Sequence, residues 1–310
     1  MSKYAPHIVL ATLALSAMLV IPAACAQTSV RERIRDRIAD RTAPPVPHGQ
    51  SSTQARTLTV QGEERLYRVY VPALPNSGTY ALLFAFHGYS SNATEQEIVG
   101  NMKELADRDG VVIVYPEGLS SPSGKQFWRT QASQDRETEL TFVKAMLTQV
   151  QSAHPVDPDR IYATGISNGG GMANMVAAEM SDVFAAIAPV AGAYYDYTDY
   201  SPSEAVAIMA FHGTLDRIVP IGGRAKLPAI TAWSGNWASI NGCATTPVTI
   251  RNEGQLNWKR WGDCASPVNL ITIEGEGHTW PGSPFSKRTN TDINVSEMMF
   301  DFFRRHPKRR

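Results

Sequence analysis

A single serine, Ser167, stands between glycines in the stretch G-I-S-N-G at residues 165–169, and two more glycines follow at 170 and 171. Glycine in a helix costs about 1 kcal/mol relative to alanine, so helix propensity does not explain these residues. The pattern G-x-S-x-G after a strand is typical of a nucleophile elbow, a tight turn that exposes a serine hydroxyl. The spacing therefore predicts that Ser167 is a nucleophile.

A serine hydroxyl needs a base near neutral pH, and in this arrangement an acid and then a histidine follow the serine along the chain. Among the seven histidines, His212 precedes the acid loop and His306 lies in the basic tail. His278, in G-E-G-H-T-W-P-G after the last predicted strand, meets the requirement. We predict that His278 is the base, and a purely structural histidine is the alternative.

Asp216, in F-H-G-T-L-D-R-I-V-P, is the predicted acid because it follows a later buried strand. Its expected role is to hold the His278 ring in the correct tautomer and to stabilise the imidazolium that forms. Asp196 and Asp199 lie on a different loop and are the competing candidates.

Acyl transfer also needs two N–H donors for the oxyanion, worth about 3 kcal/mol each. The backbone N–H of Asn168, directly after the nucleophile, is one candidate. The other is the N–H of Tyr89 in H-G-Y-S-S-N, after the strand ending at Phe86. We expect the His87 side chain to brace this loop.

Aromatic residues near the predicted strand ends are candidates for a substrate pocket or for loop packing, and the sequence leaves both readings open. They comprise Trp280 and the cluster Tyr194, Tyr195, Tyr197 and Tyr200. Trp128 and Arg129, in Q-F-W-R-T, are expected to pack a loop.

Apolar runs alternate with helix-like segments along the chain, which predicts a mostly parallel sheet covered on both faces in one α/β domain. An N-terminal antiparallel hairpin, T-L-T-V and L-Y-R-V-Y-V, precedes it. The predicted strands are 81–86, 111–115, 160–166, 185–190, 205–211 and 268–273. The predicted helices are 94–107, 137–152, 169–180, 227–240 and 292–304.

The first 26 residues have the features of a secretory signal peptide, with Lys3, an apolar run and the small-residue pattern Ala24-Cys25-Ala26. A membrane anchor and lipidation of Cys25 are the alternatives. A charged, proline-rich linker at 27–55 and a catalytic domain at 56–310 are expected to follow. We therefore predict a secreted protein, extracellular or periplasmic.

The mature chain keeps Cys243 and Cys264, which in an oxidising compartment can form a disulfide worth about 3 kcal/mol; two free thiols are the alternative. The 29 basic and 29 acidic residues give a net charge of zero, which argues against nucleic-acid or anionic-membrane partners. No metal-ligand spacing occurs, and we expect no metal and no cofactor.

Five motifs in order, H-G-Y, G-I-S-N-G-G-G-M, A-P-V-A-G, H-G-T-L-D-R-I-V-P and G-H-T-W-P-G, resemble the secreted esterase family that joins feruloyl esterases with polyhydroxybutyrate depolymerases, similar to carbohydrate esterase family 1. The resemblance implies an α/β-hydrolase fold, the triad Ser167, Asp216 and His278, and a disulfide between Cys243 and Cys264 near the active site. Glu276 departs from the family, which more often has glycine there. No polymer-binding domain follows, so we do not expect efficient attack on solid polyester.

These observations predict a secreted serine esterase that works through an acyl-enzyme, of the feruloyl esterase or short-chain polyester depolymerase type. Its partner is a small or polymeric ester from plant cell walls or polyhydroxyalkanoate. A peptidase or acyltransferase on the same fold, or a non-catalytic binder of glycan or polyester, is the alternative.

Overall fold

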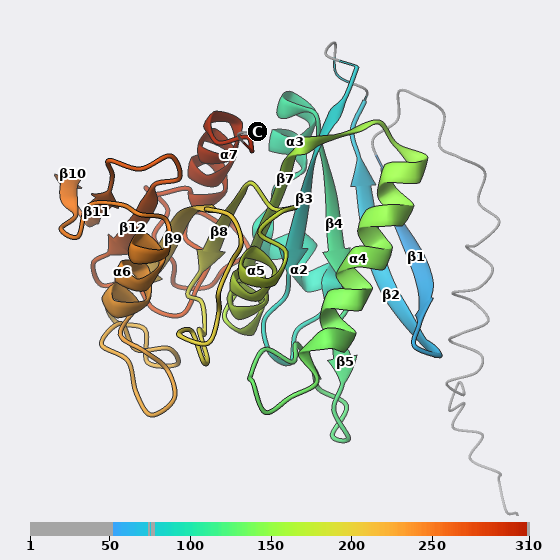
Figure 1. Cartoon of the computed structure of the whole chain (residues 1–310), viewed down its shortest axis with the longest axis horizontal. Coiled ribbons are helices and arrows are strands. Elements are labelled where there is room, and N and C mark those ends of the chain that lie inside the picture. Colours follow the sequence, from blue (N-terminus) through green and yellow to red (C-terminus); the bar gives the residue numbers. More distant parts are fainter. Residues whose placement is uncertain (1–51, 74, 76–77, 309–310) are drawn as a thin grey trace, which may run out of the picture. The chain divides into compact units, whose positions relative to one another are not determined.

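The structure is a computed structural model that describes residues 52–308 except 74, 76 and 77 (Figure 1). The expected signal peptide at 1–26 and most of the expected linker lie outside the described residues. Strand β1 (Ser52–Val60) includes the last residues of the segment 27–55, so regular structure is already present before Arg56.

The N-terminal hairpin is present as predicted. β1 pairs antiparallel with β2 (Glu63–Val71), with Val60 opposite Glu63. Gln61 and Gly62 form the two-residue turn with φ of 51° and 84°. Positive φ at both central positions is typical of the turns whose twist matches a hairpin.

The central sheet has ten strands in the order β1-β2-β4-β3-β7-β8-β9-β12-β11-β10. Its middle, from β4 to β12, is parallel, which confirms the predicted mostly parallel sheet. All six predicted apolar strands are observed as β3 (Tyr80–Phe86), β4 (Val111–Pro116), β7 (Val156–Ile166), β8 (Ala186–Val190), β9 (Ala207–Gly213) and β12 (Val268–Ile273). Four of them, β3, β7, β9 and β12, deliver the predicted site residues at their carboxyl ends.

Four strands were not predicted. β10 (Val248–Glu253) and β11 (Leu256–Trp261) form an antiparallel hairpin that extends the sheet beyond β12. Every residue of β10 is exposed, so it lacks the apolar run that identified the other strands. β5 (Leu119–Ser120) and β6 (Gln126–Phe127) form a separate two-stranded sheet.

Helices cover both faces of the sheet (Figure 1). The core cluster on one face includes residues of α4 (Arg136–Ala153), α5 (Asn168–Glu179) and α6 (Ile230–Ile240). The cluster on the other includes residues of α2 (Ala93–Gly100), α3 (Lys103–Asp109) and α7 (Val295–Arg305). The predicted single helix at 94–107 is wrong: it is two helices, because Asn101 ends α2 in the left-handed region with φ of 47°.

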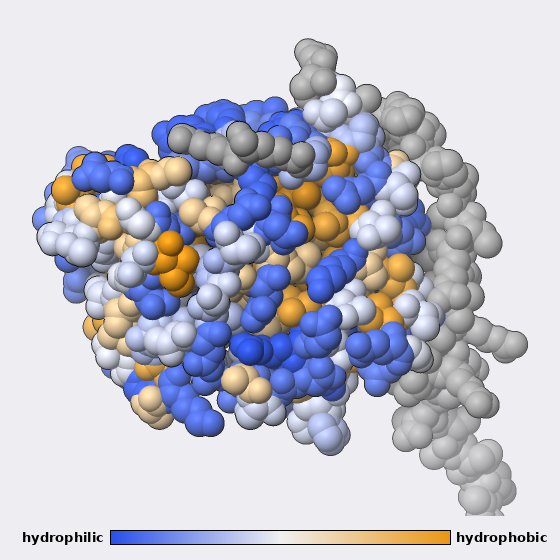
Figure 2. Space-filling view, in the orientation of Figure 1, coloured by the Kyte–Doolittle hydropathy of each residue, from blue (hydrophilic) through white to orange (hydrophobic). Residues whose placement is uncertain are grey.

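Figure 2 shows the face covered by α4, α5 and α6, where hydrophilic side chains surround smaller hydrophobic patches. α4 and α6 therefore direct their apolar sides inward, as amphipathic surface helices do, whereas α5 is buried along nearly its whole length. Among the residues that the structure describes, no helix has both the length and the apolar composition to cross a membrane.

The predicted disulfide is present, with 2.10 Å between the sulfurs of Cys243 and Cys264. Both sulfurs lie within 3.6 Å of the Ser266 carbonyl, just before β12 begins at Val268. The disulfide thus lies at the amino end of β12, whereas the predicted site residues follow carboxyl ends. Six residues of strand span about 20 Å, so the expectation of a disulfide near the active site is not supported.

Candidate active site

Ser167 lies in the turn between β7 and α5, with φ of 58° and ψ of −120°. A non-glycine residue at positive φ is strained by about 1 to 3 kcal/mol and persists only where its surroundings fix it. Here the Ser167 N–H donates to the Val190 carbonyl at 3.0 Å, and the Ser167 carbonyl accepts from Gly171 and Ala193 at 3.0 Å each. The backbone on both sides of the side chain is therefore held in place.

The glycines beside Ser167 allow its turn to pack tightly against β3. A β-carbon at Gly169 would lie 2.2 Å from the Phe86 carbonyl oxygen, and one at Gly165 would lie 2.5 Å from the Gly169 carbonyl oxygen. Both contacts are with backbone, which cannot move aside cheaply. The glycines are thus required by a close approach of chain segments at the strand ends.

We expect Gly169→Ala to destabilise the fold by about 3 kcal/mol, because overpacking against rigid neighbours costs 1 to 3 kcal/mol or more. Gly235→Ala in α6 is the matched control, since nothing lies within 4 Å of the added carbon. That change is expected to be neutral or to stabilise by up to about 1 kcal/mol. Urea unfolding of both variants tests this, and equal stability of the two would contradict it.

Asp216 and His278 are brought together by the loops after β9 and β12, which are adjacent parallel strands. His278 Nδ1 lies 2.7 Å from Asp216 Oδ2. Asp216 Oδ1 accepts hydrogen bonds from the N–H groups of Ile218 and Val219, both at 2.8 Å. The carboxylate is therefore oriented by its own loop and presents its second oxygen to the imidazole.

Burial raises the pKa of the Asp216 carboxyl, but several groups oppose this effect. The hydrogen bond and charge of His278, the Val219 N–H and the nearby His212 together hold the pKa below its usual range. Asp216 is thus an ionised carboxylate at neutral pH. This is the state that orients a histidine and stabilises its protonated form.

Ser167 leaves β7, which is separated from β9 only by β8, so all three residues follow carboxyl ends of neighbouring strands. Within the described residues the Ser167 hydroxyl makes no hydrogen bond with His278. Such contacts are often long in unliganded enzymes and tighten when substrate binds. The structure joins Asp216 to His278 and places Ser167 at the same edge of the sheet.

The loop after β3 passes directly beside Ser167. A β-carbon at Gly88 would lie 3.5 Å from the Ser167 β-carbon, so Tyr89, the next residue, lies in the segment beside Ser167. Asn168 is the first residue of α5, and N–H groups at helix starts have no intrahelical acceptor. Neither the Tyr89 nor the Asn168 N–H has an acceptor among residues 52–308 as described. Both donors are free for an oxyanion.

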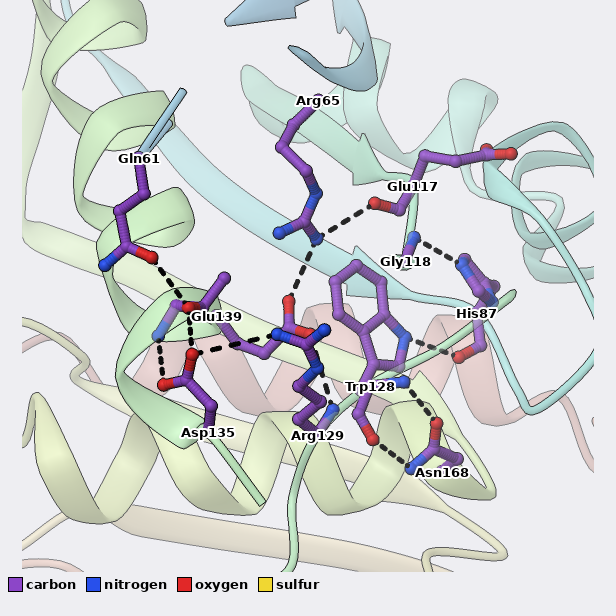
Figure 3. Close-up of polar contacts among 11 residues, drawn as sticks. Gln61, Arg65, His87, Glu117, Gly118, Trp128, Arg129, Asp135, Glu139 and Asn168 are labelled. Atoms are coloured by element: carbon purple, nitrogen blue, oxygen red, sulfur yellow. Dashed lines mark hydrogen bonds and ion pairs between the residues drawn. The ribbon is translucent and has the colours of Figure 1, made fainter. Parts of the chain in front are cut away.

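A buried polar network holds these donors in position (Figure 3). The Asn168 side chain accepts from the Trp128 N–H at 2.7 Å and donates to the Trp128 carbonyl at 3.1 Å. The Trp128 indole donates to the His87 carbonyl at 2.9 Å. His87 Nε2 accepts from the Gly118 N–H at 2.9 Å, and its Nδ1 lies 2.7 Å from the Gly88 carbonyl. These contacts confirm that His87 and Trp128 brace the loop.

Below this network lies an ion pair with almost no exposure, Arg65 Nη2 to Glu139 Oε2 at 2.9 Å. Arg65 also donates to the Glu117 carbonyl at 3.3 Å, next to Gly118, and Glu139 accepts from the Arg129 N–H at 3.4 Å (Figure 3). Burial raises the pKa of Glu139 against the opposing effect of Arg65. The pair therefore holds the segment between Glu117 and Arg129 at both of its ends, and this segment contains Gly118 and Trp128.

Burial lowers the pKa of His87 from its ordinary value of 6.5 to about 4. Between these pH values the unfolded chain binds a proton that the folded chain does not, so stability falls as pH decreases from about 6.5 to about 4. At 1.36 kcal/mol per pKa unit, the expected loss is about 3 kcal/mol.

The His87→Gln variant lacks this titration and is expected to lose correspondingly less stability over the same pH range. His212 contributes in the same direction in both proteins, so the difference between them isolates His87. Urea unfolding at pH 7 and near pH 4.5 measures it. Parallel pH dependence in the two proteins would show that His87 does not carry the effect.

Two of the aromatic candidates are core residues. Tyr194 is fully buried and stacks on Trp233 with ring centroids 3.7 Å apart. Trp280 is also fully buried, and its indole donates to the Ser296 hydroxyl at 2.9 Å. Since neither ring reaches the surface, the expectation that they contact substrate is not supported. Tyr195 is partly buried against the same core cluster as Tyr194.

Four exposed apolar side chains were missed by the sequence reasoning. They lie on the loops that carry the site residues and are Tyr89 (55% exposed), Leu215 (60%), Ile218 (56%) and Phe285 (59%). Exposed apolar residues are informative when they gather around one site. Nothing in their sequence pattern distinguishes them, because exposure depends on how the loops fold. We call these four residues the apolar rim.

Glu276 anchors the His278 loop. Its buried carboxylate accepts from the Asn290 N–H at 2.6 Å, from the Gly277 N–H at 3.3 Å and from the Thr279 hydroxyl. Its backbone carbonyl accepts from the Leu215 N–H at 2.9 Å. The residue therefore connects the His278 loop to the Asp216 loop.

A second imidazole, His212, also lies beside Asp216, with its Nε2 3.5 Å from Asp216 Oδ2. Chain order excluded His212 as the base, and its contact with Asp216 was not predicted. The sequence feature that could have indicated this contact is the spacing of four residues between His212 and Asp216 in H-G-T-L-D. Among the described residues, no cluster of three or more histidine, cysteine or acidic side chains could hold a metal ion.

The arrangement of strands and helices is that of an α/β hydrolase. The solved structure of an acetyl xylan esterase from Aspergillus awamori matches with a TM-score of 0.58 at 17% identity, covering 81% of this chain and 99% of that chain. A likeness at this identity shows the fold alone, and the fold is the α/β-hydrolase fold that was expected.

The sequence comparisons identify the family. Residues 66–231 match the profile of the family described as esterase PHB depolymerase. NocK of Nocardia uniformis subsp. tsuyamanensis, which carries the name of an esterase, is 30% identical over 290 residues, covering 83% of this chain and 84% of NocK. Feruloyl esterase B of Piromyces equi is 30% identical over 212 residues, covering 64% of this chain and 39% of that protein. The chain belongs to the esterase PHB depolymerase family.

Proposed function

We propose that this chain is a secreted serine esterase in which Ser167, His278 and Asp216 form a catalytic triad. The observation that carries the proposal is the 2.7 Å contact between His278 Nδ1 and the oriented Asp216 carboxylate, beside a serine held at positive φ. In the reaction, His278 Nε2 takes the Ser167 proton as Oγ attacks the ester carbonyl. The alcohol then leaves with that proton, and water hydrolyses the acyl-enzyme by the same route.

The Tyr89 and Asn168 N–H groups are the proposed oxyanion donors, since both are free and both neighbour Ser167. Preorganised donors of this kind stabilise the charge that develops on the carbonyl oxygen without reorganisation during the reaction. The network through Trp128 and His87 keeps them fixed.

The substrate is proposed to be a carboxylic ester of feruloyl or short hydroxyalkanoate type, from a plant cell wall or a polyhydroxyalkanoate. The family name and feruloyl esterase B support this class, and the apolar rim supplies surface for the parts of an ester beside its carbonyl. Secretion with removal of residues 1–26 agrees with the disulfide, because disulfides persist in oxidising compartments.

A panel of substrates tests the proposal on purified mature protein that begins at Gln27. We expect hydrolysis of p-nitrophenyl butyrate and of methyl ferulate or a hydroxybutyrate oligomer, no cleavage of a peptide anilide, and labelling by a fluorophosphonate probe. Cleavage of the anilide would indicate a peptidase. A protein that neither turns over esters nor accepts the probe would be a non-catalytic binder, and the proposal would fail.

Esterase activity should fall as the pH becomes acidic, because an imidazole must be neutral to act as a base. The Asp216 carboxyl is ionised at neutral pH, since its pKa is held below the usual value. The first loss of activity on acidification is therefore not due to protonation of Asp216. A pH profile of kcat/KM on p-nitrophenyl butyrate measures it, and a flat profile down to pH 4 would contradict the role of His278.

A further inference from the structure

The His212 imidazole touches the proposed acid but has no part in the proton transfer itself. It lies on β9 opposite Thr272 of β12 and is 2% exposed. Its Nε2 lies 2.7 Å from the Val219 carbonyl oxygen and 3.5 Å from Asp216 Oδ2. One ring nitrogen thus faces both the acid and the loop that orients the acid.

The Val219 carbonyl defines the tautomer of this ring. A carbonyl oxygen can only accept a hydrogen bond, so His212 Nε2 carries the proton and donates it. The same nitrogen lies 3.5 Å from Asp216 Oδ2, the oxygen that contacts His278. The N–H of His212 therefore binds the loop of the proposed acid through the Val219 carbonyl.

The backbone of Val219 is held by two side chains, those of Asp216 and His212. Its N–H donates to Asp216 Oδ1 at 2.8 Å, and its carbonyl accepts from His212 at 2.7 Å. Val219 itself is buried, so its carbonyl relies on a partner within the protein. A buried carbonyl without a partner drives the loop toward another conformation. The orientation of Asp216 therefore depends on His212.

Burial is the main reason that the His212 ring is neutral. Burial lowers the pKa of His212 and His278 adds to this, while the Val219 carbonyl and Asp216 act in the opposite direction. A neutral ring can donate its hydrogen bond without placing a second cation beside the carboxylate. Asp216 then remains available to stabilise the His278 imidazolium.

We propose that His212 is a positioning residue of the active site: its Nε2–H holds the Val219 carbonyl so that Asp216 Oδ2 stays directed at His278 Nδ1. This inference rests on the proposed triad. It assigns to the histidine of H-G-T-L-D a role that acts through Asp216 and not through substrate.

Two polar variants with side chains of different length, His212→Gln and His212→Asn, test the inference. The terminal amide of glutamine can occupy the place of Nε2, whereas the shorter amide of asparagine reaches only the place of Nδ1. We expect His212→Asn to lower kcat on p-nitrophenyl butyrate about 10- to 100-fold with KM within about twofold, as loss of an orienting partner does. His212→Gln should stay within about threefold of wild type. The concentration of active sites is measured by fluorophosphonate titration, and kcat is calculated from that concentration. Unfolded protein therefore does not lower the measured kcat.

The pH profile separates positioning from mere support of the fold. A well-placed carboxylate favours the protonated imidazole, so a poorly placed one moves the acidic limb of kcat/KM to lower pH. We expect this shift in His212→Asn and not in His212→Gln. Full kcat in His212→Asn, an unmoved acidic limb, or failure of His212→Gln to preserve kcat would each overturn the inference.

Nitrogen-15 NMR of wild-type protein provides a test that does not depend on how the variants fold. The His212 ring should be neutral and protonated at Nε2 at neutral pH. A ring protonated at Nδ1 would overturn the inference. Failure of the triad proposal is recognised separately, because wild-type protein would then lack esterase activity and probe labelling.

Discussion

Replacement of Ser167 by alanine is expected to lower kcat for ester hydrolysis by about 10⁴- to 10⁶-fold, as loss of the nucleophile does in serine hydrolases. The hydroxyl makes no hydrogen bond within the described residues, so its removal leaves no buried partner unsatisfied. The backbone contacts of Ser167 to Val190, Gly171 and Ala193 do not involve the side chain. Ser167→Ala should therefore unfold at the same urea concentration as wild type.

The measurement is the rate of p-nitrophenyl butyrate hydrolysis together with fluorophosphonate labelling. Ser239→Ala, an exposed serine of α6, is the control and should keep both activity and label. If Ser167→Ala retained more than about a hundredth of wild-type turnover, the nucleophile would lie elsewhere.

Asp216→Asn is expected to lower kcat by about 10⁴-fold, because the amide selects the wrong histidine tautomer. The N–H groups of Ile218 and Val219 keep an oxygen at the Oδ1 position, so the new NH₂ group faces His278. It then donates to Nδ1, and the imidazole proton moves to Nε2. Nε2 can no longer accept the Ser167 proton.

Asp196→Asn is the matched control because Asp196 was a competing candidate in the sequence. Its carboxylate accepts from the Ala132 N–H at 2.7 Å and belongs to a different loop. We expect this variant to keep wild-type kcat. Steady-state kinetics of both proteins decide the assignment, and loss of activity in Asp196→Asn alone would transfer the role of the acid to that residue.

Most of the sheet could be predicted because its parallel strands are buried on both faces and read as continuous apolar runs. The same criterion could not find β10, whose six residues are all exposed. The break between α2 and α3 was also missed, since Asn101 adopts its left-handed conformation within a segment that is otherwise helical in pattern. These elements are determined by tertiary packing and not by local periodicity.

The candidate site was predictable to the extent that chain order and strand ends determine it. Asp216 and His278 come together because β9 and β12 are adjacent and parallel. The burial of Tyr194 and Trp280 could not be predicted, because a loop aromatic can face either the solvent or the core. The disulfide lies at the amino end of β12 because Cys243 and Cys264 both precede that strand in the chain, which the sequence order already indicated.

The apolar rim has a consequence for how this scaffold can change. Tyr89, Leu215, Ile218 and Phe285 are more than half exposed, whereas the groups that orient Asp216 and the loop after β3 are buried. Exposed side chains away from special contacts usually alter stability by less than about 0.5 kcal/mol when replaced. New specificities can therefore arise here through surface substitutions, with the reactive machinery inherited unchanged, which makes these four positions the natural targets for directed evolution.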